Sequence, residues 1–104
     1  VAGRPIGHQG LTHIGELTSL RGLDLRGTQV TDDCLAHLGK LTDLQFIDLS
    51  QRPITDSGLH FLDHLHLRYI GLTGTNVSEA GRARFQINNL DCEVVYERQP
   101  GETQ

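Results

Sequence analysis

The chain has 104 residues, of which 37% are hydrophobic and only 5% aromatic, and its formal net charge is -4. A chain of this length supports one domain, and because aromatic residues are so few we expect a core made chiefly of leucine. The acidic balance, without any block of about five or six basic residues, argues against a surface for nucleic acid or for an anionic membrane. No apolar run approaches the roughly 18 residues of a membrane span.

The chain begins inside a repeating pattern. Val1 and Ile6 hold the places that Leu25 and Val30 hold in the next unit, with the same spacing between the two members of each pair. The first unit, residues 1–16, therefore has only the second half of a repeat.

Three apolar positions recur along the chain at a nearly constant interval. The sets are Leu23, Leu25 and Val30, then Ile47, Leu49 and Ile54, then Ile70, Leu72 and Val77. The second interval is shorter than the first by a single position. Both lie within the period of about 20–29 residues that is typical of solenoid arrays, in which stacked units share one continuous core.

Within one unit the apolar spacing changes from that of a strand to that of a helix. Leu23 and Leu25 alternate with Asp24, which indicates a short strand with both leucines inward. A hydroxyl residue followed by an acid then suits the start of a helix. The predicted N-caps are Thr31, Thr55 and Ser78. The predicted strands lie near 22–26, 46–50, 69–73 and 92–96, and the predicted helices lie on the opposite side near 8–14, 32–38, 56–63 and 79–88.

The last unit departs from the pattern and predicts a C-terminal cap at 79–96. Arg82 and Asn88 stand where the earlier units have leucine, so we expect these two positions to be wet. A closing strand follows, with three inward residues: Cys92, Val94 and Tyr96. The domain then spans residues 1–97, and the polar residues 98–104 form a disordered tail.

The pattern L-x-x-L-x-L-x-x-T-x-V-T-D-x-x-L resembles the leucine-rich repeat family over residues 17–96. Cys34, shortly after V-T-D, is similar to the cysteine-containing subclass, and the T-x-V-T-D wording is similar to its bacterial arrays. The resemblance implies a right-handed α/β solenoid, with a curved ladder of parallel strands and short helices on its convex side. It also implies a non-catalytic module or scaffold whose concave face binds another protein. Arg52 interrupts the positions that Thr28 and Thr75 hold in their units, so the turn there departs from the family pattern.

Outward strand positions form the candidate binding surface. In the predicted register they make three columns: Gly22, Phe46 and Tyr69; Asp24, Asp48 and Gly71; and Arg26, Ser50 and Thr73. The last strand continues these columns with Asp91, Glu93 and Val95. The predicted partner-binding residues are Asp24, Arg26, Phe46, Asp48, Tyr69 and Glu93.

Two features of this surface favour a protein partner. Exposed aromatic residues are preferred anchors of interfaces, so Phe46 and Tyr69 are its expected centre, although they could simply shield the strands. Asp24 and Asp48 would lie about 4.8 Å apart on neighbouring strands, where like charges are unfavourable. That cost suggests a basic side chain on the partner, and a solvated acidic face is the alternative.

A second hypothesis is a metal-binding enzyme, or enzyme subunit, that uses histidines of the helix side. The histidines are His8, His13, His37, His60, His64 and His66. His60 and His64 have the i, i+4 spacing of zinc sites, but no third ligand or H-E-x-x-H motif accompanies them. His13 and His37 hold equivalent repeat positions, which indicates packing. We therefore predict no enzyme, no metal and no cofactor, and bound zinc in the purified chain would reverse this ranking.

The two cysteines, Cys34 and Cys92, do not make a disulfide framework. They fall in different units, too far apart to bridge, so both are interpreted as reduced and inert thiols. The first residues also lack the basic and then apolar layout of a signal peptide. These features favour the cytoplasm.

The amino end carries no polar substitutions of the kind found at the carboxyl end. Its apolar residues are Val1, Ile6, Leu11 and Ile14. Bare apolar surface costs about 25 cal/mol for each Å² in water, so we expect this end to be covered by an upstream segment or, less favoured, by a second chain.

Overall fold

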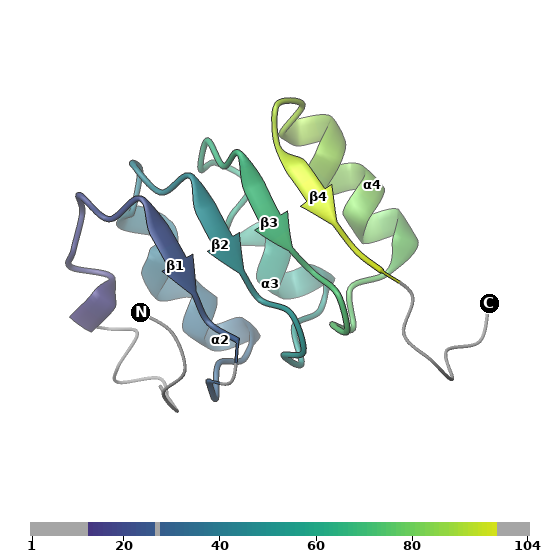
Figure 1. Ribbon diagram of the computed structural model, residues 1–104, viewed down its shortest axis with the longest axis horizontal. Helices are drawn as coiled ribbons and strands as arrows, with labels where there is room; N and C mark the ends of the chain where they lie inside the picture. The colour runs from purple at the N-terminus through teal and green to yellow at the C-terminus, as the bar shows by residue number, and fades with distance from the viewer. Residues whose placement is uncertain (1–12, 27, 98–104) are drawn as a thin grey trace.

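In a computed structural model, which describes residues 13–26 and 28–97, the chain is a mixed α/β structure built on one parallel sheet. The strands of the described residues are β1 (Gly22–Asp24), β2 (Phe46–Asp48), β3 (Tyr69–Gly71) and β4 (Glu93–Val95). They lie side by side in chain order, so each new strand joins the edge made by the one before it (Figure 1). The predicted strands and their parallel pairing are confirmed.

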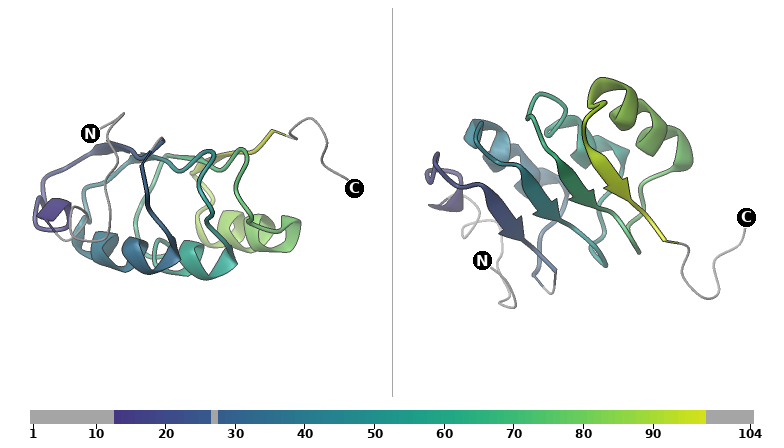
Figure 2. Two further views of the ribbon diagram at one scale, coloured as in Figure 1. Left: turned by 90° about the horizontal axis from the view of Figure 1, so that it is seen from below. Right: turned by 45° about the horizontal axis from the view of Figure 1, so that its top comes forward.

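Short helices form a second layer against one face of the sheet, and the other face is left open (Figure 2). They are α2 (Asp32–Leu35), which runs into the 3-10 helix η1 (Ala36–Lys40), then α3 (Asp56–His60) and α4 (Glu79–Asn88). Residues 13 and 14 are also helical, whereas the rest of the helix predicted near 8–14 lies outside the described residues. None of the helices described is long and apolar enough to cross a membrane.

The register of the strands carries the apolar residues into the core. Leu23 pairs with Ile47, Ile47 with Ile70, and Ile70 with Val94. The first three are buried, and Val94 packs against the core from the edge strand. The core is aliphatic apart from Phe85 and the two cysteines, as the composition predicts.

The helices predicted near 32–38 and 56–63 are found in those places, but neither is a single α-helix over its whole predicted range. The first changes to 3-10 geometry after Leu35, and α3 ends at His60 and continues as turns. Tighter i→i+3 bonds let a chain turn within few residues, and here each short unit must bring the chain back to the next strand. The last helix, α4, was predicted at 79–88 and occupies those residues.

Two aspartates of the helix layer bind the start of the following helix. The Asp32 carboxylate accepts hydrogen bonds from the backbone N–H and the hydroxyl of Thr55. Asp56 accepts the same pair of bonds from Ser78, at 2.8 Å and 2.6 Å. The Ser78 hydroxyl thereby holds the pKa of Asp56 below its usual value. Asp32 and Asp56 thus also join neighbouring units, a role that the sequence pattern did not indicate.

The three predicted N-caps behave differently. Thr55 accepts a hydrogen bond from the backbone of Ser57, and Ser78 accepts one from Gly81. Both caps are confirmed. Thr31 also stands at the N-cap of α2, as predicted, but its hydroxyl makes no capping bond and lies 3.6 Å from the sulfur of Cys34.

The threonine positions of the turns after the strands are buried. The hydroxyl of Thr28 donates to the carbonyl of Leu25, and Thr75 donates to that of Leu72 at 2.7 Å. In the middle unit Arg52 holds the equivalent place, and its guanidinium donates to the Thr28 carbonyl. The irregular turn expected there is therefore bonded back to the preceding unit.

The carboxyl end is closed by a cation and a ring. The guanidinium of Arg82 lies 3.7 Å from the centre of the Tyr96 ring and donates to the carbonyl of Val77 at 3.0 Å. The prediction that Arg82 is wet is wrong in this respect, because the side chain is half-buried against Tyr96. Asn88 is exposed as expected, and Cys92 is buried. The predicted tail, 98–104, lies outside the described residues.

Candidate functional site

The centre of the candidate site is a pair of aromatic rings on the strand face, by which we mean the face of the sheet that the helices leave open. Phe46 and Tyr69 are register partners on β2 and β3. Their ring centres lie 4.7 Å apart with an angle of 8° between the planes, so the rings are stacked. Phe46 is 39% exposed, and Tyr69 is half-buried. The sheet register therefore builds an accessible aromatic platform from residues of two successive units.

Three charged side chains form a network beside this platform. Arg26 donates to Asp24 through Nε at 3.0 Å and through Nη2 at 2.6 Å. The Nε of Arg26 also lies 3.5 Å from Oδ2 of Asp48. The repulsion expected between Asp24 and Asp48 is thus offset within the chain, and it gives no separate argument for a basic partner.

The electrostatic effect of this network extends to the tyrosine. The Arg26 guanidinium lowers the pKa of Asp24, so that carboxylate remains charged to unusually acidic pH. Burial raises the pKa of the Tyr69 hydroxyl, and the charges of Asp48 and Glu93 raise it further. The aromatic platform therefore lies in a region of negative potential.

Asp48 is the one buried acid of the predicted set. Its Oδ1 accepts the backbone N–H of Ser50 at 2.9 Å, and its side chain lies over Gly71, its register partner on β3. A Cβ on Gly71 would stand 2.5 Å from that Oδ1, so the missing side chain makes room for the carboxylate. The Asp48 side chain therefore bonds to the backbone just after β2, packs over β3 and also faces Arg26 of the charged network.

Glu93 belongs to a different column from the one predicted. It is the register partner of Tyr69, and Val95 is the partner of Gly71. The columns predicted for Asp91, Glu93 and Val95 are therefore wrong by two positions. Tyr69 and Glu93 are 24 positions apart, as Gly22 and Phe46 are, whereas the predicted column paired Tyr69 with Asp91 at an interval of only 22. As a result, Glu93 extends the aromatic row directly.

The histidines of the helix side do not converge. His60, at the end of α3, lies 3.2 Å from Asp63 and 3.1 Å from Arg84, whereas His64 contacts the carbonyl of Gly39. Nowhere in 13–26 or 28–97 do three His, Cys, Asp or Glu side chains come together in a group that could hold a metal. His8 lies outside these ranges.

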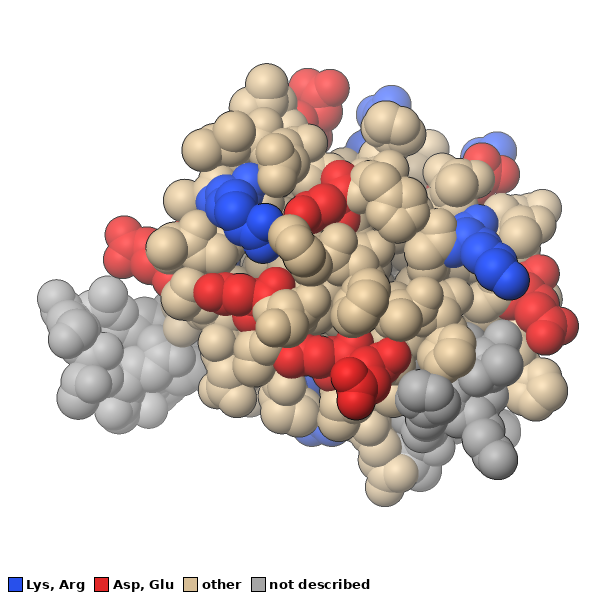
Figure 3. Space-filling view, turned by 180° about the vertical axis from the view of Figure 1, so that it is seen from behind, with Lys and Arg blue, Asp and Glu red and all other residues tan. Residues whose placement is uncertain are grey.

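Charged side chains of both signs are scattered over the helix side, most of which is uncharged, and acids gather below its centre in Figure 3. This is where the helices begin, and the acids of their first turns are Asp32, Asp33, Asp56 and Glu79. Acids are favourable at helix N-termini, so this cluster has a structural explanation.

Neither cysteine is placed for nucleophilic chemistry. Cys34 and Cys92 are both buried, and neither belongs to a disulfide. Burial, with the nearby charge of Glu93, raises the pKa of the Cys92 thiol to about 11. That thiol stays protonated at neutral pH, and only the thiolate is a good nucleophile.

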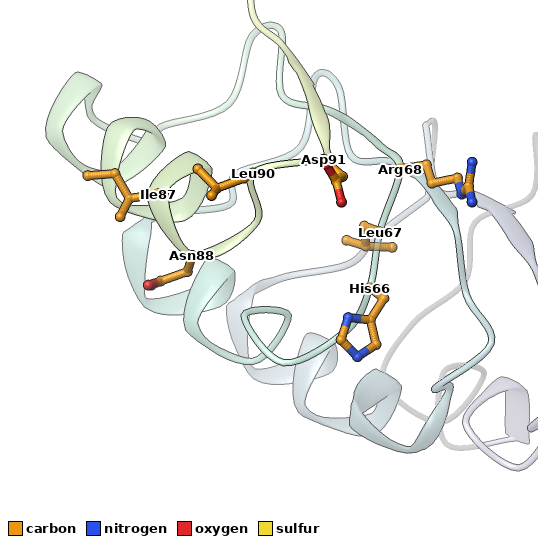
Figure 4. Close-up of a pocket in the computed structure, with 7 residues that line it drawn as sticks. All are labelled: His66, Leu67, Arg68, Ile87, Asn88, Leu90 and Asp91. Carbon is orange, nitrogen blue, oxygen red and sulfur yellow. The ribbon is translucent and has the colours of Figure 1, made fainter.

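A groove that the sequence did not predict lies beside the end of α4 (Figure 4). Its volume is about 610 Å³, and it is lined by His66, Leu67, Arg68, Ile87, Asn88, Leu90 and Asp91. Leu90 is 80% exposed here because the register of β3 with β4 puts Asp91, and not Leu90, at the place that Leu67 holds in the core. The interval of 24 residues between Ile70 and Val94, in place of the 23 between Ile47 and Ile70, was the signal that could have revealed it.

Comparison with family models and curated proteins does not assign a function to this chain. No protein-family model matches the chain, and a search of curated proteins gives no significant match.

Proposed function

We propose that the chain is a leucine-rich repeat solenoid that binds a protein partner through its strand face. The observation that carries the proposal is the Phe46–Tyr69 stack, exposed on a face that none of the described helices covers. A ring that is 39% exposed contributes little to the core, whereas exposed aromatic residues are frequent anchors of interfaces.

The family assignment is supported by the equivalence of the units. Strand, turn and helix return with the same core residues, the same parallel register and the same acid bonded to the next unit. Such repetition is typical of solenoids, which use an extended strand face for binding.

The charged network supports a protein partner rather than a small molecule. Asp24, Arg26 and Asp48 lie at the rim of the aromatic platform, and polar residues around an apolar centre are typical of protein interfaces. The aromatic pair would provide the anchor and the network would limit which partners fit. No enzymatic activity is proposed, because the described histidines and cysteines contact separate groups.

A pair of matched variants tests the proposal. Phe61 is 38% exposed directly after α3, on the other side of the molecule, so it matches Phe46 in exposure. Three forms are each immobilised and exposed to a protein mixture: the unaltered chain, F46A/Y69A and F61A. The proteins that each form retains are then compared by quantitative mass spectrometry. We expect a partner that binds the chain and F61A but not F46A/Y69A. With that partner purified, calorimetry should give a loss of about 2–4 kcal/mol for F46A/Y69A.

Equal retention by all three forms would contradict the strand face as the binding surface. Loss of the partner with F61A alone would move the surface to the helix side.

A further inference from the structure

One face of the aromatic stack is open, and the open side lies over a glycine. The 4.7 Å between the ring centres of Phe46 and Tyr69 is close to the spacing of about 4.8 Å between strands, so the rings stack along the direction that crosses the sheet. Tyr69 covers one face of the Phe46 ring, and the other face therefore turns toward β1. The register partner of Phe46 on β1 is Gly22.

The space above Gly22 is open. A Cβ placed on Gly22 would have no atom of the described residues within 4 Å other than those of its chain neighbours. We call this space the Gly22 notch, bounded by Gly22, the free face of Phe46 and Asp24. On Gly71, by contrast, a Cβ would meet the carboxylate of Asp48. Among the described residues, nothing therefore fills the place beside the Phe46 ring that a side chain at position 22 would take.

The surroundings of the notch favour a positive charge. Asp24 follows Gly22 on the same face of the same strand, about 7 Å along it. Two carboxylates, Asp24 and Asp48, face one guanidinium, Arg26, so the network keeps a net negative charge. The face of an aromatic ring also attracts cations. The Phe46 ring and the nearby carboxylates therefore favour a ligand that has both an apolar part and a positive charge.

We propose that the Gly22 notch receives a cationic side chain of the protein partner, an arginine or a lysine, which stacks on Phe46 and pairs with Asp24. This rests on the proposed function, because it assigns the chemistry of the residue that the strand face binds. An arginine suits the site best, because its planar guanidinium stacks on rings and keeps donors free for a carboxylate. Both oxygens of Asp24 already accept bonds from the backbone and side chain of Arg26, so a second cation would be held by charge attraction to the two carboxylates and by the Phe46 ring.

A model peptide tests the inference without an identified partner. The labelled full chain is titrated with N-acetyl-Gly-Arg-Gly-amide into the tens of millimolar, and the amide of Gly22 and the ring of Phe46 are followed by NMR. The control peptide carries citrulline, which keeps the shape of arginine and removes its charge. We expect the arginine peptide to shift both signals in a saturable way, with at least tenfold weaker binding of the citrulline peptide.

Two variants separate the notch from a general attraction to acids. Gly22→Val fills the notch at an open strand position, and Asp33→Asn removes an exposed charge in the first turn of α2, on the helix side. We expect Gly22→Val to abolish the shifts of Phe46 and Asp33→Asn to change the affinity less than twofold. Thermal melting verifies that both variants are folded. If Gly22→Val is not folded, a folded Gly22→Leu variant takes its place.

Several results would overturn the inference. They are equal binding of the two peptides, shifts that survive Gly22→Val, an equal loss with Asp33→Asn, and no shift at Gly22 or Phe46 at any concentration. None of these affects the comparison of F46A/Y69A with F61A, so the proposed function can stand if this inference fails. For example, a partner that no longer binds F46A/Y69A but still binds Gly22→Val fully would support the proposed function and contradict this inference.

Discussion

The two faces of the molecule use similar residues for different ends. On the helix side, Asp32 and Asp56 each accept two hydrogen bonds from the next unit, and the glycines beneath them leave room for their carboxylates. On the strand face, Asp24 is held by Arg26 at the surface, and the rings of Phe46 and Tyr69 stack on each other outside the core.

The difference between the two faces indicates which residues can change to alter binding without loss of the fold. Acids of the helix side hold units together, so changes there act on stability. Side chains of the strand face lie on strands that the core and the sheet already fix, so changes there act on recognition. Each of the following experiments can break or sharpen this division.

Gly58→Val should cause the largest loss of stability. A Cβ at this position of α3 would collide with the Asp32 carboxylate and press on Ile54. The lost bonds to Thr55 and the strain should reduce the free energy of unfolding by about 3 kcal/mol or more, measured by urea denaturation.

Gly22→Val is the matched control on the strand face. Its Cβ meets nothing among the described residues, and valine is favoured in strands, so stability should change by no more than about 0.5 kcal/mol or should rise. Similar losses for the two valines would break the comparison.

Asp32→Ala should cost about 1–3 kcal/mol, because it leaves two donors of Thr55 without their charged acceptor. Asp33→Ala is the control, since both acids lie in the first turn of α2 and lose the same helix-dipole interaction. If the two alanine variants unfold at the same urea concentration, the bond between the units contributes nothing measurable.

Asp56 should make stability depend on acid. Its pKa is lower in the folded chain than the ordinary 3.8, so its contribution is complete above that value and is lost as the pH falls through the folded pKa. Asp56→Asn should reduce the slope of unfolding free energy between about pH 4 and pH 2, in chemical denaturation at a series of pH values. Because Asp24 also has a lowered pKa, part of the slope should remain. An unchanged slope would show that Asp56 does not contribute to the acid dependence of stability.

F46A/Y69A should have a small effect on folding, about 1 kcal/mol in thermal or urea unfolding, which is the usual value of an exposed aromatic pair. A loss of several kcal/mol would mean that the stack supports the fold, and the division between the faces would then be wrong.

The sequence by itself determined the repeating part of this protein. The nearly constant interval between Leu23, Ile47 and Ile70 was enough to predict the strands, their parallel register and the buried residues. Apolar periodicity is a strong signal because each inward residue must lose its contact with water whatever its neighbours are. The same register was also enough to bring Phe46 and Tyr69 together.

Only the tertiary structure decided which polar groups meet. Asp24 and Arg26 are close in sequence, but the approach of Arg26 to Asp48 and the bonds from Asp32 to Thr55 depend on side-chain directions between units. The register of β3 with β4 places Glu93 in the aromatic row, although the predicted columns put it elsewhere, and leaves Leu90 at the surface. Polar contacts are directional and short in range, so a spacing that is sufficient for burial does not determine them.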